Sequence, residues 1–355
     1  MTARRLDEIV RQIRPAASEL AGAAQNRLNN LTKPPGSLGR LETLAQTLVM
    51  IAGSLDVRIR RKVIFTFAGD HGIAEEGVSA YPSAVTAQMV LNFLRGGAAV
   101  NVLAREAGAT VRIIDSGTLT RIDHPDLIQK RIGAGTRNFF REDAMTQADA
   151  ISAIEAGAAV FYDEDDRQRI DLAGVGDMGI ANTTAAAAIF CAFLNLSPDQ
   201  VAGRGTGLDD AGLRKKIQVL TEALQRHTPD PNDPIGVLSK VGGFEIGEMA
   251  GCFLAGAERR TPMLVDGFIS TAAAEIAVRI CPAVRDYLFY SHCSAESGHE
   301  LVLQTIGAQP LLDFDMRLGE GTGAALAMHV LTSACAMFQD MATFDSAGVD
   351  RKRDS

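Results

Sequence analysis

Short apolar runs that each stop at a small or acidic residue constrain the fold of this chain more than any other feature. Five such runs end at Gly, Asp or Ser: residues 63–68, 110–114, 170–175, 263–265 and 287–290. Between them lie Ala-rich stretches of helical character: residues 84–107, 143–162, 182–195, 210–226, 244–257 and 268–280. Strands that alternate with helices predict a parallel sheet, and near-continuous apolar strands predict helices on both faces. The polar strand ends then meet at one edge, where open α/β sheets bind ligands.

The two ends of the chain follow a different pattern, in which no strand separates the helices. Apolar residues recur at near-helical spacing through residues 6–30, where Pro15 is expected to break or kink the helix. A stiff Pro-Pro-Gly turn precedes a second expected helix, which runs to about Gly53 and which Ser37 could cap. The apolar residues 323–341 predict a buried C-terminal helix. These helices suggest a small helical element outside the main sheet.

Composition narrows the class of protein. At 355 residues the chain is long enough for about two domains. Its 46% hydrophobic content, 34 glycines and lack of tryptophan fit an Ala- and Gly-rich α/β enzyme. A net charge of −8 argues against nucleic acid or an acidic membrane surface as the main partner, but not against a small anionic ligand. Five scattered cysteines, with no apolar run that reads as a membrane span or signal peptide, predict a cytoplasmic protein.

One carboxylate lies among glycines at the expected start of the C-terminal helix. Residues 316–323 read Met-Arg-Leu-Gly-Glu-Gly-Thr-Gly, so Gly319 and Gly321 flank Glu320. Because glycines let the backbone approach a ligand closely, Glu320 could be a general base held against a small ring. Alternatively, Glu320 caps the helix by interacting with its dipole. These residues alone favour the cap, so the choice depends on the rest of the chain.

A glycine-rich segment follows the third expected strand and opens a helix. Gly174, Gly176 and Gly179 fit a G-x-G-x-x-G string, but a lone match is weak evidence for dinucleotide binding. The acidic residue that should end a second strand about twenty positions on is missing. The Asn-Thr-Thr at residues 182–184 offers hydroxyls, an amide and free N–H groups, which suit one phosphate. An ordinary helix cap is the alternative; with the glycines beside it, we favour a phosphate site.

A second flexible loop lies at residues 203–207, in the order Gly-Arg-Gly-Thr-Gly. The helix that follows carries Lys215 and Lys216, which makes this region locally basic in an acidic protein. The loop is therefore a second candidate for binding an anion. A plain connection between helices, with a solvated Lys pair, explains the same residues equally well.

Two strand ends carry residues that metal binding or nucleophilic catalysis would need. His71 follows the first strand, and Ser291, His292 and Cys293 follow the last, with His299 nearby. Zinc sites need closer ligand pairs than these, and a nucleophilic serine would need a G-x-S-x-G elbow, which is absent from the sequence. We therefore predict no metal site, and structural hydrogen bonds for the histidines.

Several segments together carry a resemblance to a known family. They are Leu-Thr-Lys-Pro-Pro-Gly-Ser-Leu-Gly at 31–39, Gly-Asp-His-Gly at 69–72, Gly-Asp-Met-Gly-Ile-Ala-Asn-Thr-Thr at 176–184, Ser-Lys-Val-Gly-Gly-Phe at 239–244, Asp-Gly-Phe at 266–268, Ser-His at 291–292 and Arg-Leu-Gly-Glu-Gly at 317–321. With these motifs in register, the chain from about residue 8 to 342 resembles the nicotinate-nucleotide–dimethylbenzimidazole phosphoribosyltransferase family.

The resemblance implies a fold, a reaction and an assembly. The fold is α/β: a Rossmann-like, mainly parallel sheet with flanking helices in a large domain at residues 60–310, and a small mainly helical domain from residues 1–59 together with 311–355. The reaction transfers the phosphoribosyl group of nicotinate mononucleotide to 5,6-dimethylbenzimidazole, giving α-ribazole 5′-phosphate and nicotinate in cobalamin lower-ligand synthesis. The resemblance also implies a homodimer and small-molecule substrates. No cofactor or metal is implied, because the donor carries a monophosphate rather than a pyrophosphate.

The resemblance also assigns roles to individual residues. The general base is Glu320, and a second acidic position that is usually Glu is here Asp177, one methylene shorter, which leaves its role open. Tyr81, Ser83 and Gln88 are implied to line the benzimidazole pocket. The full set of implied substrate-binding residues is Gly176, Met178, Gly179, Asn182, Thr183, Thr184, Gly205, Lys216, Tyr81, Ser83, Gln88, Ser291, Leu318 and Gly319.

The chemistry of this transfer agrees with a single base. Nicotinate leaves with a neutral ring nitrogen, so no acid need protonate it, whereas a glycosidase must protonate its leaving oxygen. The benzimidazole attacks the anomeric carbon through one nitrogen and loses a proton from the other, which Glu320 would take. Attack from the face opposite nicotinate converts the β-linkage to α. Met178 and Leu318 would supply apolar walls, and residues 179–184 with Lys216 would hold the phosphate.

Two alternatives stay open at this point. The same transfer could use a different acceptor, such as another benzimidazole, a purine or a phenol, because Asp177 departs from the usual glutamate. The chain could also be a catalytically silent subunit that binds nicotinate mononucleotide and needs a partner. The intact Glu320 argues against the silent subunit.

Overall fold

The fold is built on a parallel sheet. The computed structural model describes residues 4–350. Six strands pair in the order β3-β2-β1-β4-β5-β6, and every pair is parallel. The strands are β1 (Lys62–Gly69), β2 (Ala109–Gly117), β3 (Leu127–Gln129), β4 (Leu172–Met178), β5 (Met263–Val265) and β6 (Leu288–Tyr290). The predicted Rossmann-like sheet is confirmed; β3 has no counterpart among the predicted strands, because its three residues form no long apolar run.

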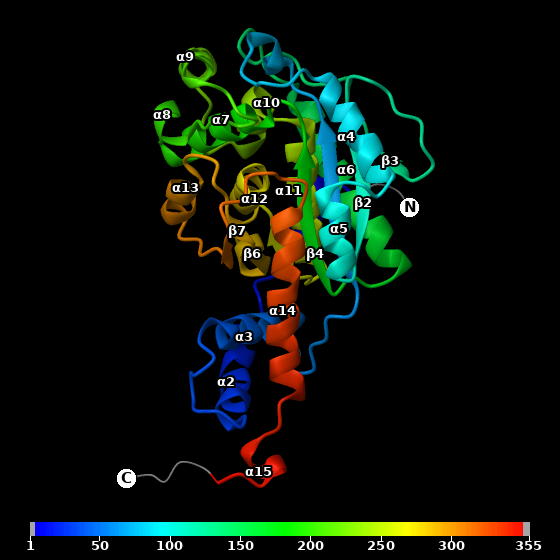
Figure 1. The fold of residues 1–355 in the computed structure, drawn as a ribbon, viewed down its shortest axis with the longest axis vertical. Coiled ribbons are helices and arrows are strands. Elements are labelled where there is room, and N and C mark those ends of the chain that lie inside the picture. Colours follow the sequence, from blue (N-terminus) through cyan, green and yellow to red (C-terminus); the bar gives the residue numbers. More distant parts are fainter. Residues whose placement is uncertain (1–3, 351–355) are drawn as a thin grey trace.

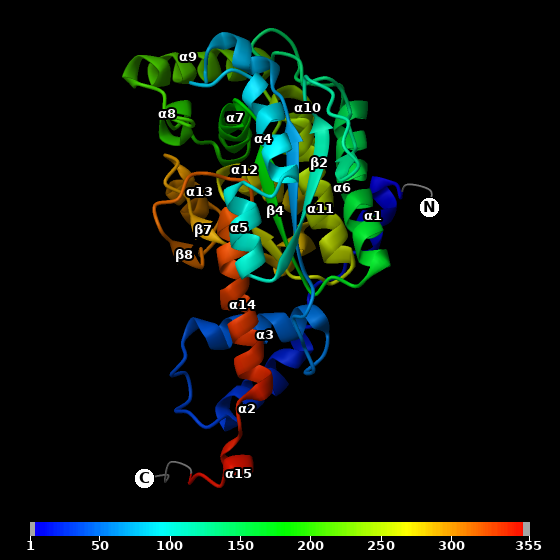
Figure 2. The same ribbon diagram turned by 45° about the vertical axis from the view of Figure 1, so that its right-hand side comes forward.

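Helices cover both faces of the sheet (Figures 1 and 2). One layer contains α4 (Ala84–Leu94), α5 (Ala99–Glu106) and α14 (Thr322–Asp340), and the other contains α6 (Gln147–Arg167), α11 (Phe244–Glu258) and α12 (Phe268–Ile280). The single helix predicted at 84–107 is two helices, because the chain turns at Gly96, where φ is 75°. The strand order reverses between β1 and β4, which places a ligand-binding crevice at the carboxyl ends of these strands.

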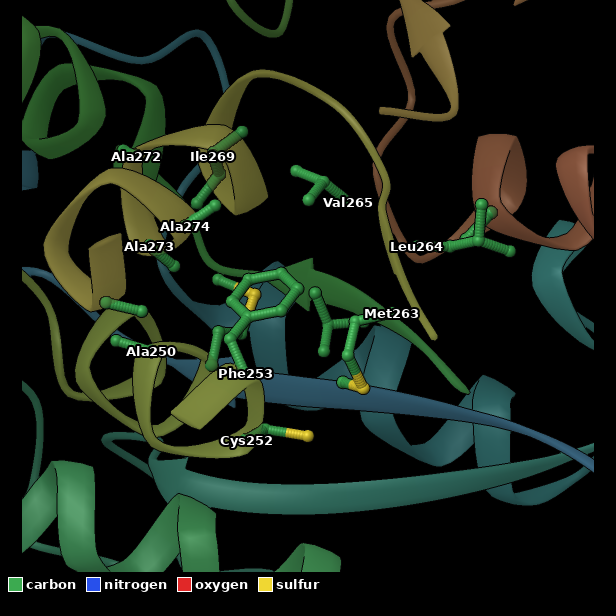
Figure 3. Packing of buried hydrophobic residues seen from close by; sticks show 14 of the residues in the cluster. Ala250, Cys252, Phe253, Met263, Leu264, Val265, Ile269, Ala272, Ala273 and Ala274 are labelled. Carbon is green, nitrogen blue, oxygen red and sulfur yellow. The ribbon is translucent and has the colours of Figure 1, made fainter. Parts of the chain in front are cut away.

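Helix α11 is the centre of the hydrophobic core. Its residues 244–257 are all buried, and the helix packs on α6, α12 and the central strands. Figure 3 shows Phe253 of this helix between Met263 of β5 and the small side chain of Ala273 of α12. Small residues let the helices pack closely on the sheet, so the core fixes the strand ends that form the crevice.

The remaining elements connect these layers. They are the short 3₁₀ helices η2 (Gly72–Glu76) and η3 (Pro282–Tyr287), the helices α7 (Asn182–Leu194), α8 (Pro198–Val201), α9 (Asp210–His227), α10 (Pro234–Val241), α13 (His299–Thr305) and α15 (Phe344–Ala347), and a second small parallel sheet of β7 (His292–Cys293) and β8 (Leu312–Asp313). Helices α7 and α9 agree with the helices predicted at 182–195 and 210–226. In the described part of the chain, no helix combines the length and apolar character needed to cross a membrane.

Helices from the two chain ends lie together at one end of the molecule (Figure 1). The helix predicted at 6–30 is three pieces around Pro15: α1 (Leu6–Gln12), η1 (Ser18–Leu20) and α2 (Ala21–Asn30). Helix α2 packs on α3 (Arg40–Ala52), and Arg27 donates hydrogen bonds to two carbonyls at the end of α14. The predicted cap by Ser37 is wrong, because Gly39 precedes α3 without a side-chain cap.

Helix α1 lies apart from these terminal helices, against α6 and α11. The backbone N–H of Leu6 donates to Glu155 of α6 at 2.9 Å. The predicted division at residues 60 and 310 therefore stays a prediction, and residues 1–3 and 351–355 of the predicted small domain lie outside the described residues.

Candidate active site

A cavity of about 460 Å³ lies beside the carboxyl ends of β4, β5 and β6. It occupies the edge of the sheet at which the sequence predicts a ligand. Many of the predicted site residues line it: Tyr81, Asp177, Met178, Gly179, Asn182, Thr183, Gly205, Leu318, Gly319 and Glu320. These residues lie before α4, at the end of β4, at the start of α7, in the 203–207 loop and in the glycine-flanked Glu320 loop. Folding therefore brings distant motifs together.

The other six predicted residues lie outside this lining: Gly176, Lys216, Ser83, Gln88, Thr184 and Ser291. Ser83 precedes α4, and Gln88 lies on the exposed side of that helix. Thr184 and Ser291 are fully buried, and their hydroxyl oxygens have no hydrogen-bond partner within residues 4–350. The roles assigned to these six residues stay predictions.

The rest of the lining comes from residues that the sequence analysis did not assign to a substrate. These residues are Val85, Met89, Ile180, Thr206, Gly267, Phe268, Ile269, His292, Ser294, Glu296 and Arg317. A signal existed for Val85 and Met89, since an apolar pair four residues apart shares one face of a helix. Phe268 follows the Asp-Gly end of β5, which is another strand-end signal. The residues from irregular loops carry no comparable pattern.

Glu320 is held in a strained loop that is hydrogen-bonded to two strands, β1 and β4. Gly319, Glu320 and Gly321 have φ values of 82°, 66° and 98°, and a left-handed conformation at Glu320 costs on the order of 1–3 kcal/mol. The hydroxyl of Thr66 in β1 donates to the Glu320 carbonyl at 2.8 Å, and the Glu320 N–H donates to the Asp177 carbonyl at 3.1 Å. The residue is 4% exposed and lines the cavity. Strain fixed this firmly is typical of a functional residue.

The alternative that Glu320 caps α14 does not hold, because a different carboxylate does so. Asp266, at the end of β5, accepts the N–H groups of Gly321 at 3.1 Å and Ala324 at 2.8 Å. The Oε2 atom of Glu320 instead accepts the N–H of Val100 in the first turn of α5, at 3.3 Å. One side of the Glu320 carboxylate is therefore anchored to a helix N-terminus while the residue faces the cavity.

The two predicted catalytic carboxyl groups have different environments. Burial raises the pKa of Glu320, the amide of Val100 offsets part of this, and repulsion from Asp266 adds to it. Burial raises the pKa of Asp177 well above its usual range, and repulsion from Asp266 adds to the effect. Asn182 donates to one oxygen of Asp177 at 2.8 Å, while the other oxygen has no partner in the described structure. Asp177 therefore holds its proton more strongly than an ordinary aspartate.

A buried cation lies behind Gly205, which lines the cavity. Lys216 is fully buried directly behind the 203–207 loop, and its Nζ donates to the Thr183 hydroxyl at 2.9 Å and the Gly203 carbonyl at 3.1 Å. Burial lowers the pKa of Lys216 to about 8, although the nearby Glu296 opposes this. Arg317 donates to the Gly205 carbonyl at 3.1 Å. Arg317 and the start of α7 therefore border this part of the cavity, and Lys216 lies behind its wall, which suits an anion.

The histidines considered as metal ligands form no metal site. His71 is paired with the buried Glu245 at 2.5 Å, and His299 accepts the Ser294 N–H at 2.8 Å. Burial lowers the pKa of His299 to about 3, so it is neutral. Residues 4–350 contain no group of His, Cys, Asp and Glu arranged to hold a metal ion. The structural hydrogen bond expected for His292 is not observed, because its Nδ1 has no partner in that range and its ring lines the cavity.

Comparisons with known proteins point to one group. A phosphoribosyltransferase family model matches residues 13–349. The protein named nicotinate-nucleotide–dimethylbenzimidazole phosphoribosyltransferase from Geobacter metallireducens is 50% identical over 354 residues, covering 98% of this chain and 99% of its own. The protein of the same name from Roseiflexus is 50% identical over 348 residues, covering 98% of each. The crystal structure of CobT from Thermus thermophilus superimposes with a TM-score of 0.90 at 44% identity, covering 94% of this chain and all of that one.

Proposed function

The chain belongs to the nicotinate-nucleotide–dimethylbenzimidazole phosphoribosyltransferase family, and we propose that it works through Glu320 as its single general base. It transfers the phosphoribosyl group of nicotinate mononucleotide to 5,6-dimethylbenzimidazole. The products, α-ribazole 5′-phosphate and nicotinate, place it in the synthesis of the lower ligand of cobalamin.

The position of Glu320 is the observation that carries the proposed mechanism. The reaction needs one group to remove a proton from the acceptor as its other nitrogen bonds to the sugar. Glu320 faces the cavity from a loop fixed by Thr66 and Asp177, and the amide of Val100 stabilises its charged form. A raised pKa makes the ionised carboxylate a stronger base than an ordinary glutamate.

Asp177 contributes differently in this proposal. Its raised pKa favours the neutral acid, which weakens the repulsion between Asp177 and Glu320. Asp177 lines the cavity, and Asn182 donates a hydrogen bond to one of its carboxyl oxygens. The other oxygen has no hydrogen-bond partner within the described residues. We propose that Asp177 helps to position substrate as a protonated group, and that Glu320 alone removes the proton.

We assign one end of the cavity to the benzimidazole acceptor and the other end to the phosphate of the donor. Met178, Leu318, Val85 and Met89 give the apolar walls that a flat, methylated benzimidazole needs. The phosphate of nicotinate mononucleotide fits the opposite end, where Lys216 supports the loop that begins α7. The transferred ribose then lies between the two ends.

The activity assay uses purified protein with nicotinate mononucleotide and 5,6-dimethylbenzimidazole. We expect α-ribazole 5′-phosphate and nicotinate to appear in equal amounts by liquid chromatography. Competing benzimidazole, adenine and phenol in the same reaction measures acceptor choice, because Asp177 replaces the glutamate usual at its position. A strong preference for adenine or phenol would contradict the proposed acceptor.

Replacing Asp266 with asparagine should move the acid limb of the pH–rate profile to lower pH. Glu320 must be ionised to accept a proton, and its pKa lies above the ordinary 4.5 because of burial and repulsion from Asp266. Removing that negative charge lowers the pKa of Glu320, so activity persists to lower pH. The measurement is kcat/KM against pH, which reports the free enzyme. A limb that stays in place or moves upward would contradict the assignment of Glu320.

Replacing Lys216 with methionine should raise KM for nicotinate mononucleotide by roughly 10- to 100-fold, the value of a charge-assisted hydrogen bond, with a smaller change in kcat. In the wild-type protein, KM should also rise as pH increases through about 8, where Lys216 loses its charge. The control is Lys215→Met, because Lys215 is the exposed neighbour on the same helix. Equal effects of the two substitutions would argue against a phosphate site at Lys216.

The predicted homodimer and cytoplasmic location belong to the same proposal. All five cysteines are free, which fits a reducing compartment. Sedimentation velocity at micromolar concentration should give a species of twice the chain mass. A monomer that retains full activity would contradict the dimer.

A further inference from the structure

Glu296 is a carboxylate in the cavity for which the proposed mechanism has no role. It is 7% exposed, lines the cavity and lies in the loop before α13. Its Oε1 accepts the N–H of Gly205 at 3.1 Å. Within residues 4–350, Oε2 accepts no hydrogen bond, so one oxygen stays available to a ligand.

The loop that carries Glu296 is fixed by its own hydrogen bonds. The Glu296 N–H donates to the Ser294 hydroxyl at 3.2 Å, and the Ser294 N–H donates to His299 at 2.8 Å. A Cβ added to Gly203 would overlap the Glu296 carboxyl group, so glycine at that position leaves room for the carboxylate. The carboxylate is therefore built into the site and is not a mobile surface group.

The neighbours of Glu296 identify the part of the substrate that it faces. Gly205 borders the end of the cavity assigned to phosphate, and Lys216 lies behind it, whereas Glu320 marks the end assigned to the acceptor. A carboxylate repels phosphate and accepts hydrogen bonds from neutral donors. The neutral donors nearest to a 5′-phosphate in nicotinate mononucleotide are the ribose hydroxyls.

We propose that Glu296 binds the 2′- and 3′-hydroxyls of the transferred ribose. This inference rests on the function proposed above. The carboxylate accepts from the sugar while Gly205 fixes its orientation. Binding the diol holds the anomeric carbon between the leaving nicotinate and the acceptor, so Glu296 also selects ribose over deoxyribose.

The test compares nicotinate mononucleotide with its 2′-deoxy and 3′-deoxy analogues. Wild-type kcat/KM should fall roughly 10- to 100-fold for at least one analogue, as expected when a hydrogen bond to a charged group is lost. Glu296→Ala should lower kcat/KM for the natural donor. The ratio of kcat/KM for the natural donor to kcat/KM for the deoxy donor should then fall to within about threefold of unity. Glu296→Gln, which can keep the Gly205 contact, should give an intermediate ratio. The control is Glu300→Gln, because Glu300 is exposed on α13.

The possible outcomes distinguish failure of the Glu296 inference from failure of the proposed function. If Glu296→Ala lowers turnover of natural and deoxy donors equally, Glu296 only joins two loops and the inference fails. If the wild-type protein uses both deoxy donors as well as the natural one, the inference fails without any variant. A wild-type protein that neither binds nor turns over nicotinate mononucleotide, by calorimetry and chromatography, would overturn both the inference and the proposed function. Thermal melts of each variant identify any loss that comes from misfolding.

Discussion

Replacing Glu320 with glutamine should lower kcat by about a hundred- to ten-thousandfold, the usual contribution of a general base, while KM for nicotinate mononucleotide changes by no more than a few fold. Glutamine keeps the size of the side chain and can still accept the Val100 N–H, but it cannot take a proton from the acceptor. In the proposed arrangement the phosphate of the donor binds away from Glu320, so the ground-state binding of the donor should be almost unchanged. Steady-state kinetics with the donor varied at saturating acceptor measures both constants.

The strain at Glu320 provides an independent check on that result. Glu320→Gly should be inactive but unfold at the same or a higher temperature, because glycine adopts a φ of 66° without steric cost. The control is Glu275→Gln, which neutralises another buried carboxyl group outside the cavity lining and should leave turnover near the wild-type value. Full turnover by Glu320→Gln would refute the assigned role.

The sequence predicts the sheet well because strand ends follow simple chemistry. Apolar runs that stop at Gly, Asp or Ser correspond to the long strands β1, β2 and β4 and to the short strands β5 and β6. The start of α14 is predicted to within one residue, because the glycines of the Glu320 loop end just before it. The strand β3 is missed because pairing with β2, and not its own three residues, makes it a strand. The break between α4 and α5 depends on a local turn that helical periodicity does not detect.

The candidate site is predicted less completely, because several contacts join residues that are far apart in the chain. The family resemblance predicts roles for Glu320 and Asp177, but the sequence does not show that Asp266, 55 residues before Gly321, caps α14 in place of Glu320. It also does not show that Gly205 meets Glu296, 91 residues later. Such pairs form only when the sheet brings its strand ends together, so local patterns cannot reveal them.

Replacing Gly176 with alanine should abolish most activity and lower the free energy of unfolding by about 1–3 kcal/mol, the usual cost of overpacking a core. Gly176 lies in β4, opposite Thr66 of β1, and a Cβ added there would overlap the backbone of Glu320 and Gly321. This contact explains the glycine better than dinucleotide binding does. Backbone atoms cannot rotate away, so the whole Glu320 loop would have to move away from β4.

A shift of about 1 Å in a catalytic group can reduce the rate roughly a hundredfold, so Gly176→Ala should lose kcat well beyond its loss of stability. Circular dichroism melts and steady-state kinetics at a temperature where the variant is folded separate the two effects. The control is Gly22→Ala in α2, because a Cβ there meets no atom within 4 Å and should leave stability unchanged or slightly higher. If Gly176→Ala keeps wild-type kcat, the geometry of the Glu320 loop does not limit the reaction. The mechanism would then need a base that tolerates movement of this loop.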